Sequence, residues 1–287
     1  MRLIRRKIYL LWLLATSFAQ DKPAYLLFSS DGKRLSYRQV LHRLLQADVI
    51  FFGELHDDPI AHWLALELVK DLHAKRKLVL GMEMFETDQQ EPLNRYLRGE
   101  IDLHQLGEEV RLWPNFSTDY APLLAYAQKE KIPVYATNAP RSLAREVARS
   151  GASALEMWDE SKRHLIAPLP FPRLDSLPSY QKMSEMAASH GIRTENFRLA
   201  QMLKDATMAY RIHQTWQAGT LFFHLNGAYH SDYHEGIVAY LRLYAPYLRV
   251  VTISTQRVEA PLKYKPPKEK IADIILVVPE SMTRTHG

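Results

Sequence analysis

Short apolar runs alternate with amphipathic stretches along most of the chain. The runs that predict strands buried on both faces are Val49–Phe52, Leu78–Met82, Val134–Ala136, Thr220–Leu225, Val250–Ser254 and Ile274–Val278. Helical stretches such as His62–Ala74 and Tyr120–Lys131 separate these runs. We therefore expect an α/β fold, with a mainly parallel sheet that is flanked by helices.

Two segments depart from this alternation. Ala24–Ser29, the Asp31-Gly32 turn and Lys33–Leu35 predict a small hairpin, because Asp-Gly readily takes positive φ. From about residue 141 to 218 the apolar runs give way to helical stretches that are broken by prolines, which predicts an inserted helical subdomain. The methionines of its second half either pack its core or form a wall for a flat apolar ligand.

Residues 1–19 have the pattern of a secretory signal peptide. Basic residues precede the apolar run Ile8–Ala15, and small residues follow it at a cleavage point before Gln20. The run is too short to span a bilayer as a helix, and no later run approaches the necessary length. We expect a mature chain without a transmembrane span, and an uncut N-terminal anchor is the alternative.

Charge and cysteine content narrow the function classes. The net charge of +5 suggests a nucleic-acid partner, but four of the excess positive charges lie in the leader, at Arg2, Arg5, Arg6 and Lys7. The mature chain keeps no basic footprint, so we expect no nucleic-acid partner. The chain has no cysteine, which excludes disulfides, thiolate metal sites and lipid attachment through cysteine. We expect an exported protein of the bacterial periplasm or cell envelope.

Polar side chains follow four of the predicted strands, at the edge where parallel sheets bind ligands. In chain order they are Glu54, His56, Glu83, Asn138, Arg141, Tyr229, His230 and His234. This convergence of ionisable and amide groups predicts a functional site. A Gly-x-x-His spacing occurs twice, at Gly53–His56 and Gly227–His230, where glycine lets the backbone turn sharply.

We expect Glu54 and Glu83 to leave adjacent strands and to lie close together in a partly buried crevice. Like charge and desolvation would then both raise a pKa. On that expectation Glu54→Gln leaves the fold intact or stabilises it, while it abolishes metal or ligand binding. The structural alternative is that both glutamates accept backbone amides at helix starts and that the histidines are hydrogen-bonded loop residues.

Four segments resemble the ChaN-like haem-binding family, which sits in a wider group with the Tiki proteins and the erythromycin esterases. They are GELHDDPIAH, GMEMFE, YAPLLAYAQKEKIPVYATNAPR and KDATMAYRI, in order between about residues 45 and 245. The resemblance implies that residues 20–287 form one ChaN-like α/β domain of an exported bacterial protein that binds haem for iron acquisition. It also implies homodimers that can enclose two stacked haems. Relatives are often lipoproteins, and the absence of cysteine departs from that pattern.

Haem binding is the leading interpretation. Haem iron accepts a histidine or tyrosine ligand, and the haem propionates need cationic partners. The polar candidates are Tyr229, His230, His234, Arg141 and His190, with Met183, Met186 and Phe85 as an apolar wall. No Cys-x-x-Cys-His motif is present, so attachment would be noncovalent. The sequence leaves the axial ligand unassigned.

A metal-dependent hydrolase is the alternative, because the Tiki branch is associated with two Gly-x-x-His motifs and an acidic residue. The matching positions, His56, His230 and Glu54, would ligate a divalent ion such as zinc or manganese. Glu54 or Glu83 would act as general base for the attacking water, and Asn138 would orient the substrate. A third interpretation, an adaptor protein, treats these residues as independent packing features.

Overall fold

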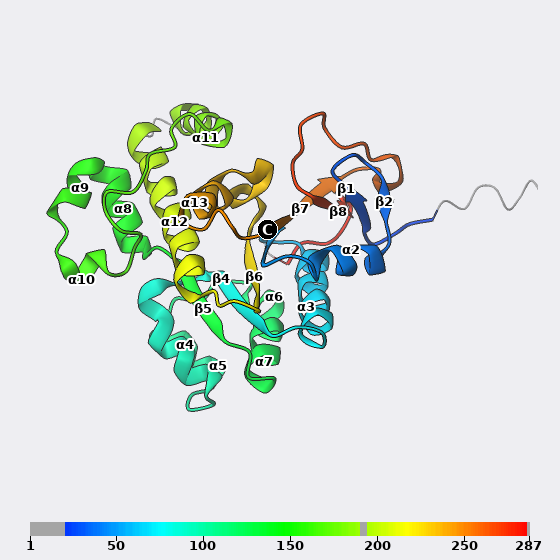
Figure 1. Ribbon diagram of the computed structural model, residues 1–287, viewed down its shortest axis with the longest axis horizontal. Coiled ribbons are helices and arrows are strands. Elements are labelled where there is room, and N and C mark those ends of the chain that lie inside the picture. Colours follow the sequence, from blue (N-terminus) through cyan, green and yellow to red (C-terminus); the bar gives the residue numbers. More distant parts are fainter. Residues whose placement is uncertain (1–20, 190–193, 286–287) are drawn as a thin grey trace, which may run out of the picture.

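The protein is built around one mainly parallel sheet with helices on both faces (Figure 1). The computed structural model describes residues 21–189 and 194–285. Within these ranges eight strands lie in the order β2-β1-β8-β7-β3-β6-β4-β5. Their bounds are β1 Leu26–Ser29, β2 Arg34–Leu35, β3 Val49–Glu54, β4 Leu78–Glu86, β5 Val134–Asn138, β6 Leu221–Gly227, β7 Val250–Val258 and β8 Ile274–Pro279. Strand β1 pairs antiparallel with β2 and β8, and all the other strand pairs are parallel, which confirms the predicted α/β class.

The predicted strands and the hairpin are confirmed, and several strands run further than the apolar runs. Strand β3 extends to Glu54, β4 to Glu86 and β6 to Gly227, so polar residues belong to the strands themselves. The register of β4 against β5 shifts between Met82 and Glu86. Glu83 therefore lies in an irregular part of β4 rather than in a loop after it, and bulges of this kind redirect a side chain.

Side chains of each central strand alternate between two cores. Phe52 and Phe223 belong to the core on one face of the sheet, and Phe51 and Phe222 belong to the core on the other. The first face is covered by α2 Tyr37–Leu44, α3 Pro59–His73, α4 Gln90–Leu97, α5 Leu103–Glu109, α6 Phe116–Asp119 and α7 Ala121–Lys129. The second face is covered mainly by α8 Arg141–Ser150, α12 Thr194–Thr215 and α13 Gly236–Tyr244.

The chain between β5 and β6 is helical. It contains α8, α9 Ala152–Met157, α10 Glu160–Arg163, α11 Pro178–Ser189 and α12. Figure 1 shows α8 to α11 gathered beside α12, at the opposite end of the molecule from the β1–β2 hairpin. Helix α12 packs against α8, α13 and β5, so this segment completes the second core. No helix within the described ranges is long and apolar enough to cross a membrane.

Helix α3 begins almost directly after β3. The side chain of Asp58 accepts hydrogen bonds from the backbone N–H groups of Ile60 and Ala61, and Pro59 occupies the first helical position. This early start brings His62, in the first turn of α3, back over the end of β3. The local sequence around Asp58 thus helps to position the candidate site.

Side chains of β6 pack closely against Gly81 in β4, and a substitution at Gly81 tests this packing. A Cβ on Gly81 would stand 2.6 Å from Phe222 Cε1 and 2.7 Å from His224 Cδ2. We expect Gly81→Ala to lower the free energy of unfolding by about 1–3 kcal/mol, as overpacked cores do. Gly107→Ala in helix α5 is the control, because a Cβ on Gly107 would meet only Leu112 Cδ1, at 3.4 Å. Equal stabilities of the two variants in urea denaturation would contradict this packing.

Candidate functional site

Glu54 ends β3 with a carboxylate that is buried at the carboxyl end of the sheet. Its Oε1 lies 2.5 Å from His56 Nδ1 and accepts the hydroxyl of Tyr120 at 3.1 Å, and its Oε2 lies 3.3 Å from His62 Nε2. Burial opposes ionisation, but the hydrogen bonds and charges of the two imidazoles outweigh it and hold the pKa of Glu54 below its usual range. Glu54 is therefore a buried carboxylate that two histidines keep charged.

His62 joins Glu54 to a second buried carboxylate. His62 Nδ1 lies 3.3 Å from Asp119 Oδ2. The side-chain amide of Asn115 donates to Asp119 and also to the backbone oxygen of His56, the latter at 2.6 Å. Asn115 thus ties the loop before α6 to the loop after β3, which fixes the position of His56.

A second cluster of carboxylates and imidazole surrounds His230. Glu83 Oε1 lies 3.3 Å from His230 Nε2, and Glu83 Oε2 accepts the Gly227 N–H at 2.8 Å. The other ring nitrogen of His230 lies 2.5 Å from Asp205 Oδ1, and Tyr180 donates to Asp205 Oδ2 at 2.6 Å. Burial disfavours the imidazolium, yet the two carboxylates raise the pKa of His230 to about 10. The charge of His230 in turn holds the pKa of Glu83 well below its usual range.

The two clusters meet at Gly227, the last residue of β6. A Cβ on Gly227 would stand 2.6 Å from His56 Cε1 and 2.9 Å from His56 Nε2, so the imidazole of His56 rests directly on this backbone. The N–H of the same residue binds Glu83. A Cβ would clash with this imidazole, which gives the glycine of the second Gly-x-x-His motif a physical reason.

Two expectations about the glutamates are wrong. Strand β6 lies between β3 and β4, so Glu54 and Glu83 do not leave adjacent strands. Neither carboxyl has a raised pKa, because each is paired with imidazoles rather than with the other carboxyl. The expectation that Glu54→Gln leaves the fold intact or stabilises it therefore loses its basis.

The described residues do not fit the divalent-metal site that the sequence suggested. Within residues 21–189 and 194–285, no group of three or more histidine or acidic side chains is arranged to hold a metal ion. His56 and Glu54 bind each other, whereas His230 belongs to the second cluster and directs both ring nitrogens at carboxylates. A metal ligand needs a free nitrogen lone pair, which His230 does not offer.

Two of the other predicted residues lie at the β5 edge of the site. Asn138 Nδ2 donates to the backbone oxygen of Glu83 at 3.2 Å, so Asn138 lies beside the second cluster. The backbone N–H of Arg141 donates to Glu86 at 2.8 Å, and its Nε lies 3.8 Å from the same carboxylate. Arg141 is thus held at the start of α8.

The predicted residues after β6 separate. His230 enters the second cluster, whereas His234 Nε2 lies 3.1 Å from Asp273 Oδ2 beside β7. The hydroxyl of Tyr229 donates to the backbone oxygen of Ser179 at 2.6 Å. His190 and the predicted signal peptide, residues 1–19, lie outside the described residues.

A cavity of about 630 Å³ opens beside the turn that follows β6. Its lining includes Tyr229, Asp232, Tyr233, Lys182 and Lys270. Both tyrosines are 41% exposed, and Tyr233 has a left-handed φ of 59°, which is uncommon for a residue other than glycine. Burial raises the pKa of Asp232 to about 7. The cavity thus presents phenol, carboxyl and ammonium groups together.

Sequence reasoning missed Asp205, Tyr120 and Tyr180 as parts of the site. Each lies far along the chain from the carboxylate or imidazole that it contacts. A signal was available for Asp205, because Met202 and Met208, three residues before and after it, place it on an apolar face of the helix, and a buried acidic residue needs a partner. The identity of that partner could not be predicted from spacing.

The comparisons with known proteins agree with this fold. A family model described as "Haem-binding uptake, Tiki superfamily, ChaN" matches residues 40–241. The chain belongs to this family. Among solved structures it is similar to ChaN of Campylobacter jejuni, whose structure shows cofacial haem binding, with a TM-score of 0.68 and 16% identity over 90% of this chain and 98% of that chain. At that identity the likeness supports the fold alone.

Two further relatives are more distant in coverage or shape. The chain is 32% identical over 139 residues to the chloroplastic protein RETICULATA-RELATED 5 of Arabidopsis thaliana, which covers 46% of this chain and 18% of that protein. The chain therefore spans less than a fifth of that relative. A solved Bacillus cereus protein matches with a TM-score of 0.48 and 12% identity over 84% of this chain and 90% of that one, which is too distant to carry an argument.

Glu54→Gln tests whether the carboxylate supports the fold. We expect a loss of about 3 kcal/mol in the free energy of unfolding at pH 7, because the buried carboxylate that contacts His56 and His62 is replaced by a neutral amide. A lowered folded-state pKa means that this stability is present above the ordinary glutamate pKa and is lost as the pH falls through the folded value. The difference between wild type and variant should therefore shrink as the pH is lowered from 7 to about 4 and below.

The control is Glu67→Gln, which removes a half-exposed partner of Lys70 and should cost no more than about 1 kcal/mol. Urea denaturation at several pH values measures the free energy of unfolding of the wild type, Glu54→Gln and Glu67→Gln. A Glu54→Gln protein as stable as the wild type at pH 7 would contradict the role of this carboxylate.

Proposed function

We propose that this protein binds haem noncovalently at the cavity beside the β6 turn, as an exported protein of bacterial iron acquisition. Membership of the haem-binding ChaN family supports the ligand class. The observation that carries the placement is the 630 Å³ cavity with two partly exposed tyrosines at its wall. Phenolate oxygen is an established axial ligand of haem iron, and haem sites are cavities of this order of size.

Tyr233 is the axial ligand that the contacts favour. The hydroxyl of Tyr229 is engaged by the Ser179 backbone, and both ring nitrogens of His230 face carboxylates. His234 Nε2 is similarly held by Asp273. The hydroxyl of Tyr233 makes no hydrogen bond in the part of the chain that the structure describes, so it is the open oxygen at the cavity. The free hydroxyl of Tyr233 suits an iron ligand better than the hydroxyl of Tyr229, which already donates a hydrogen bond.

The rest of the cavity supplies groups that haem requires. Lys182 and Lys270 both line it and can pair with the propionates, while Pro178 and Ile271 provide apolar surface. Arg141, held by Glu86 at the other edge of the sheet, is less suited to that role. Lysine ammonium groups suit the anionic propionates of haem, and an apolar wall suits its porphyrin ring.

The exposure of Tyr229 and Tyr233 also supports a homodimer. A porphyrin bound against them would keep much of its outer face in water, and burying that face against a second copy would be favourable. Export is supported by the leader pattern at residues 1–19. The periplasm or cell envelope is therefore the proposed location.

Hemin titration of the mature protein tests this proposal. We expect a saturable Soret shift, and Tyr233→Phe should weaken binding by at least tenfold because it removes the iron ligand and leaves the ring. Tyr247→Phe is the control, since Tyr247 is exposed but packs against Trp216 away from the cavity. Unchanged hemin affinity of Tyr233→Phe would refute the ligand assignment, and no saturable shift in the wild type would refute haem binding.

Acid–base hydrolysis is the second candidate, and the two carboxylate–imidazole pairs around Gly227 favour it. His56 is oriented by Glu54, and half of its side-chain surface is exposed, so solvent and substrate can reach it. Burial opposes protonation of His56, but Glu54 outweighs it and raises the imidazole pKa above its usual value. A histidine oriented by a carboxylate is the arrangement of a general base.

A chromogenic ester assay tests the second candidate. We expect His56→Gln to lower kcat/KM for p-nitrophenyl acetate by at least a hundredfold, because the substitution removes the general base and keeps the fold of the chain. His104→Gln is the control, since the imidazole of His104 is 82% exposed on α5. Equal rates for both variants, or no turnover by the wild type, would argue against hydrolysis and leave haem binding unaffected.

A further inference from the structure

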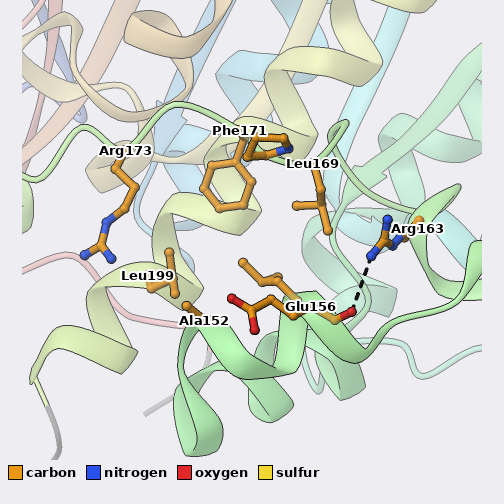
Figure 2. A pocket seen from close by; sticks show the side chains of 9 residues that line it. Ala152, Glu156, Arg163, Leu169, Phe171, Arg173 and Leu199 are labelled. Carbon is orange, nitrogen blue, oxygen red and sulfur yellow. Dashed lines mark hydrogen bonds between the residues drawn. The ribbon is translucent and has the colours of Figure 1, made fainter.

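A separate pocket lies within the helical segment between β5 and β6. Its volume is about 370 Å³, and it is lined by residues of α9, of the segment from residue 163 to 173, and of α12. Figure 2 shows this pocket, with Arg163 and Arg173 on opposite sides and Phe171 and Leu169 between them. It shares no lining residue with the cavity beside the β6 turn. The pocket is therefore a candidate for a ligand of its own.

The interior of the pocket is apolar. Its walls are the side chains of Leu155, Leu169, Pro170, Phe171 and Leu199. The volume falls at the lower end of the range for small-molecule sites, and such sites combine apolar walls with a few placed polar groups. A ligand with an extended or compact hydrocarbon body would bury apolar surface here.

Arg163 is a fixed cation at the edge of these walls. Its Nε donates to the backbone oxygen of Trp158 at 2.7 Å, and its Nη2 donates to that of Glu156 at 3.4 Å. No ion pair joins Arg163 to a carboxylate within residues 21–189 and 194–285. Two neutral carbonyls thus hold the guanidinium in place and leave its charge and remaining N–H groups for another partner. A guanidinium held in this way is organised for a carboxylate or phosphate oxygen.

Arg173, on the other side of the pocket, differs from Arg163. It binds both oxygens of Asp175, each at 2.8 Å, and also lies 3.4 Å from Glu195. Its charge is therefore already compensated. Because the two arginines have the same side chain and line the same pocket, they form a matched pair for an experiment.

Glu156 also lines the pocket, and Figure 2 shows its carboxylate near Ala152. Its side chain makes no hydrogen bond or ion pair in the described part of the chain, and the residue is exposed. Without a partner to fix it, this carboxylate can turn into solvent, whereas Arg163 is anchored twice. The preorganised group at the pocket is thus the cation.

We propose that this pocket binds an amphiphile with a hydrocarbon body and a single anionic head, whose head group contacts Arg163. A fatty-acid carboxylate has this chemistry, and so does a phosphate-headed lipid. The hydrocarbon body packs on Phe171, Leu169 and Leu199, and the head lies at the edge beside Arg163. The proposal is independent of haem binding, because the cavity beside the β6 turn contributes nothing to it.

Three ten-carbon probes isolate the contribution of the head group. Calorimetric titration of the mature protein with decanoate, decanol and decylamine compares an anion, a neutral group and a cation on the same chain. We expect decanoate to bind at least fivefold more tightly than decanol, and decylamine to bind most weakly. Equal affinities for decanoate and decanol would overturn the role of Arg163. Decyl phosphate, measured in parallel, decides between carboxylate and phosphate as the preferred head.

Variants then locate the site. Arg163→Gln should reduce decanoate affinity to that of decanol, and Arg173→Gln should leave it within twofold of the wild type. Glu156→Gln should raise it, because a nearby negative charge is removed. Loss of decanoate binding in Arg173→Gln but not in Arg163→Gln would overturn the assignment.

A blocking variant keeps the test valid if Arg163→Gln folds poorly. Ala152 is exposed at the rim of the pocket, so Ala152→Trp should fill the mouth with little cost to folding and reduce decanoate affinity at least tenfold. Met157→Trp is its control, because Met157 is 85% exposed on the same helix and does not line the pocket. Unchanged decanoate binding by a folded Ala152→Trp protein would place the ligand elsewhere. Neither tryptophan should alter hemin affinity, which separates this proposal from the haem site.

Discussion

The pairing of buried carboxylates with imidazoles at the carboxyl end of the sheet is the constraint on which the rest of the site depends. Ionised Glu54 and Glu83 would be very costly in an apolar interior without compensation. His56, His62 and Tyr120 supply it for the first, and His230 and a backbone N–H supply it for the second. The segments after β3 and β6 must therefore fold back over the strand ends, which accounts for the early start of α3 and the tight turn at Gly227.

The helical segment between β5 and β6 is tied to the site by more than the shared core. Asp205 on α12 holds His230, and Tyr180 on α11 holds Asp205. The backbone N–H of Ser179 donates to Glu235 just before α13, while its carbonyl accepts from Tyr229. A change in the position of α11 would therefore reach both the His230 cluster and the wall of the cavity.

The turn after β6 borders both the His230 cluster and the cavity. On its inner side His230 faces Glu83 and Asp205, and on its outer side Tyr229 and Tyr233 face the cavity. Tyr233 has a left-handed backbone in this turn. The proposed general base, His56, follows β3 and lies outside the turn, so experiments can separate the two candidate functions.

The sequence by itself determined the α/β class, the strands, the hairpin and most of the polar residues at the strand ends, because these follow from local patterns of apolar and polar positions. Only the tertiary structure decided that β6 lies between β3 and β4, since strand order depends on pairing between distant segments. The same holds for the contact between Asp205 and His230, because the end of α12 and strand β6 separate the two residues along the chain. The direction of the glutamate pKa shifts also needed the structure, because it depends on whether a carboxylate or an imidazole is the nearest neighbour.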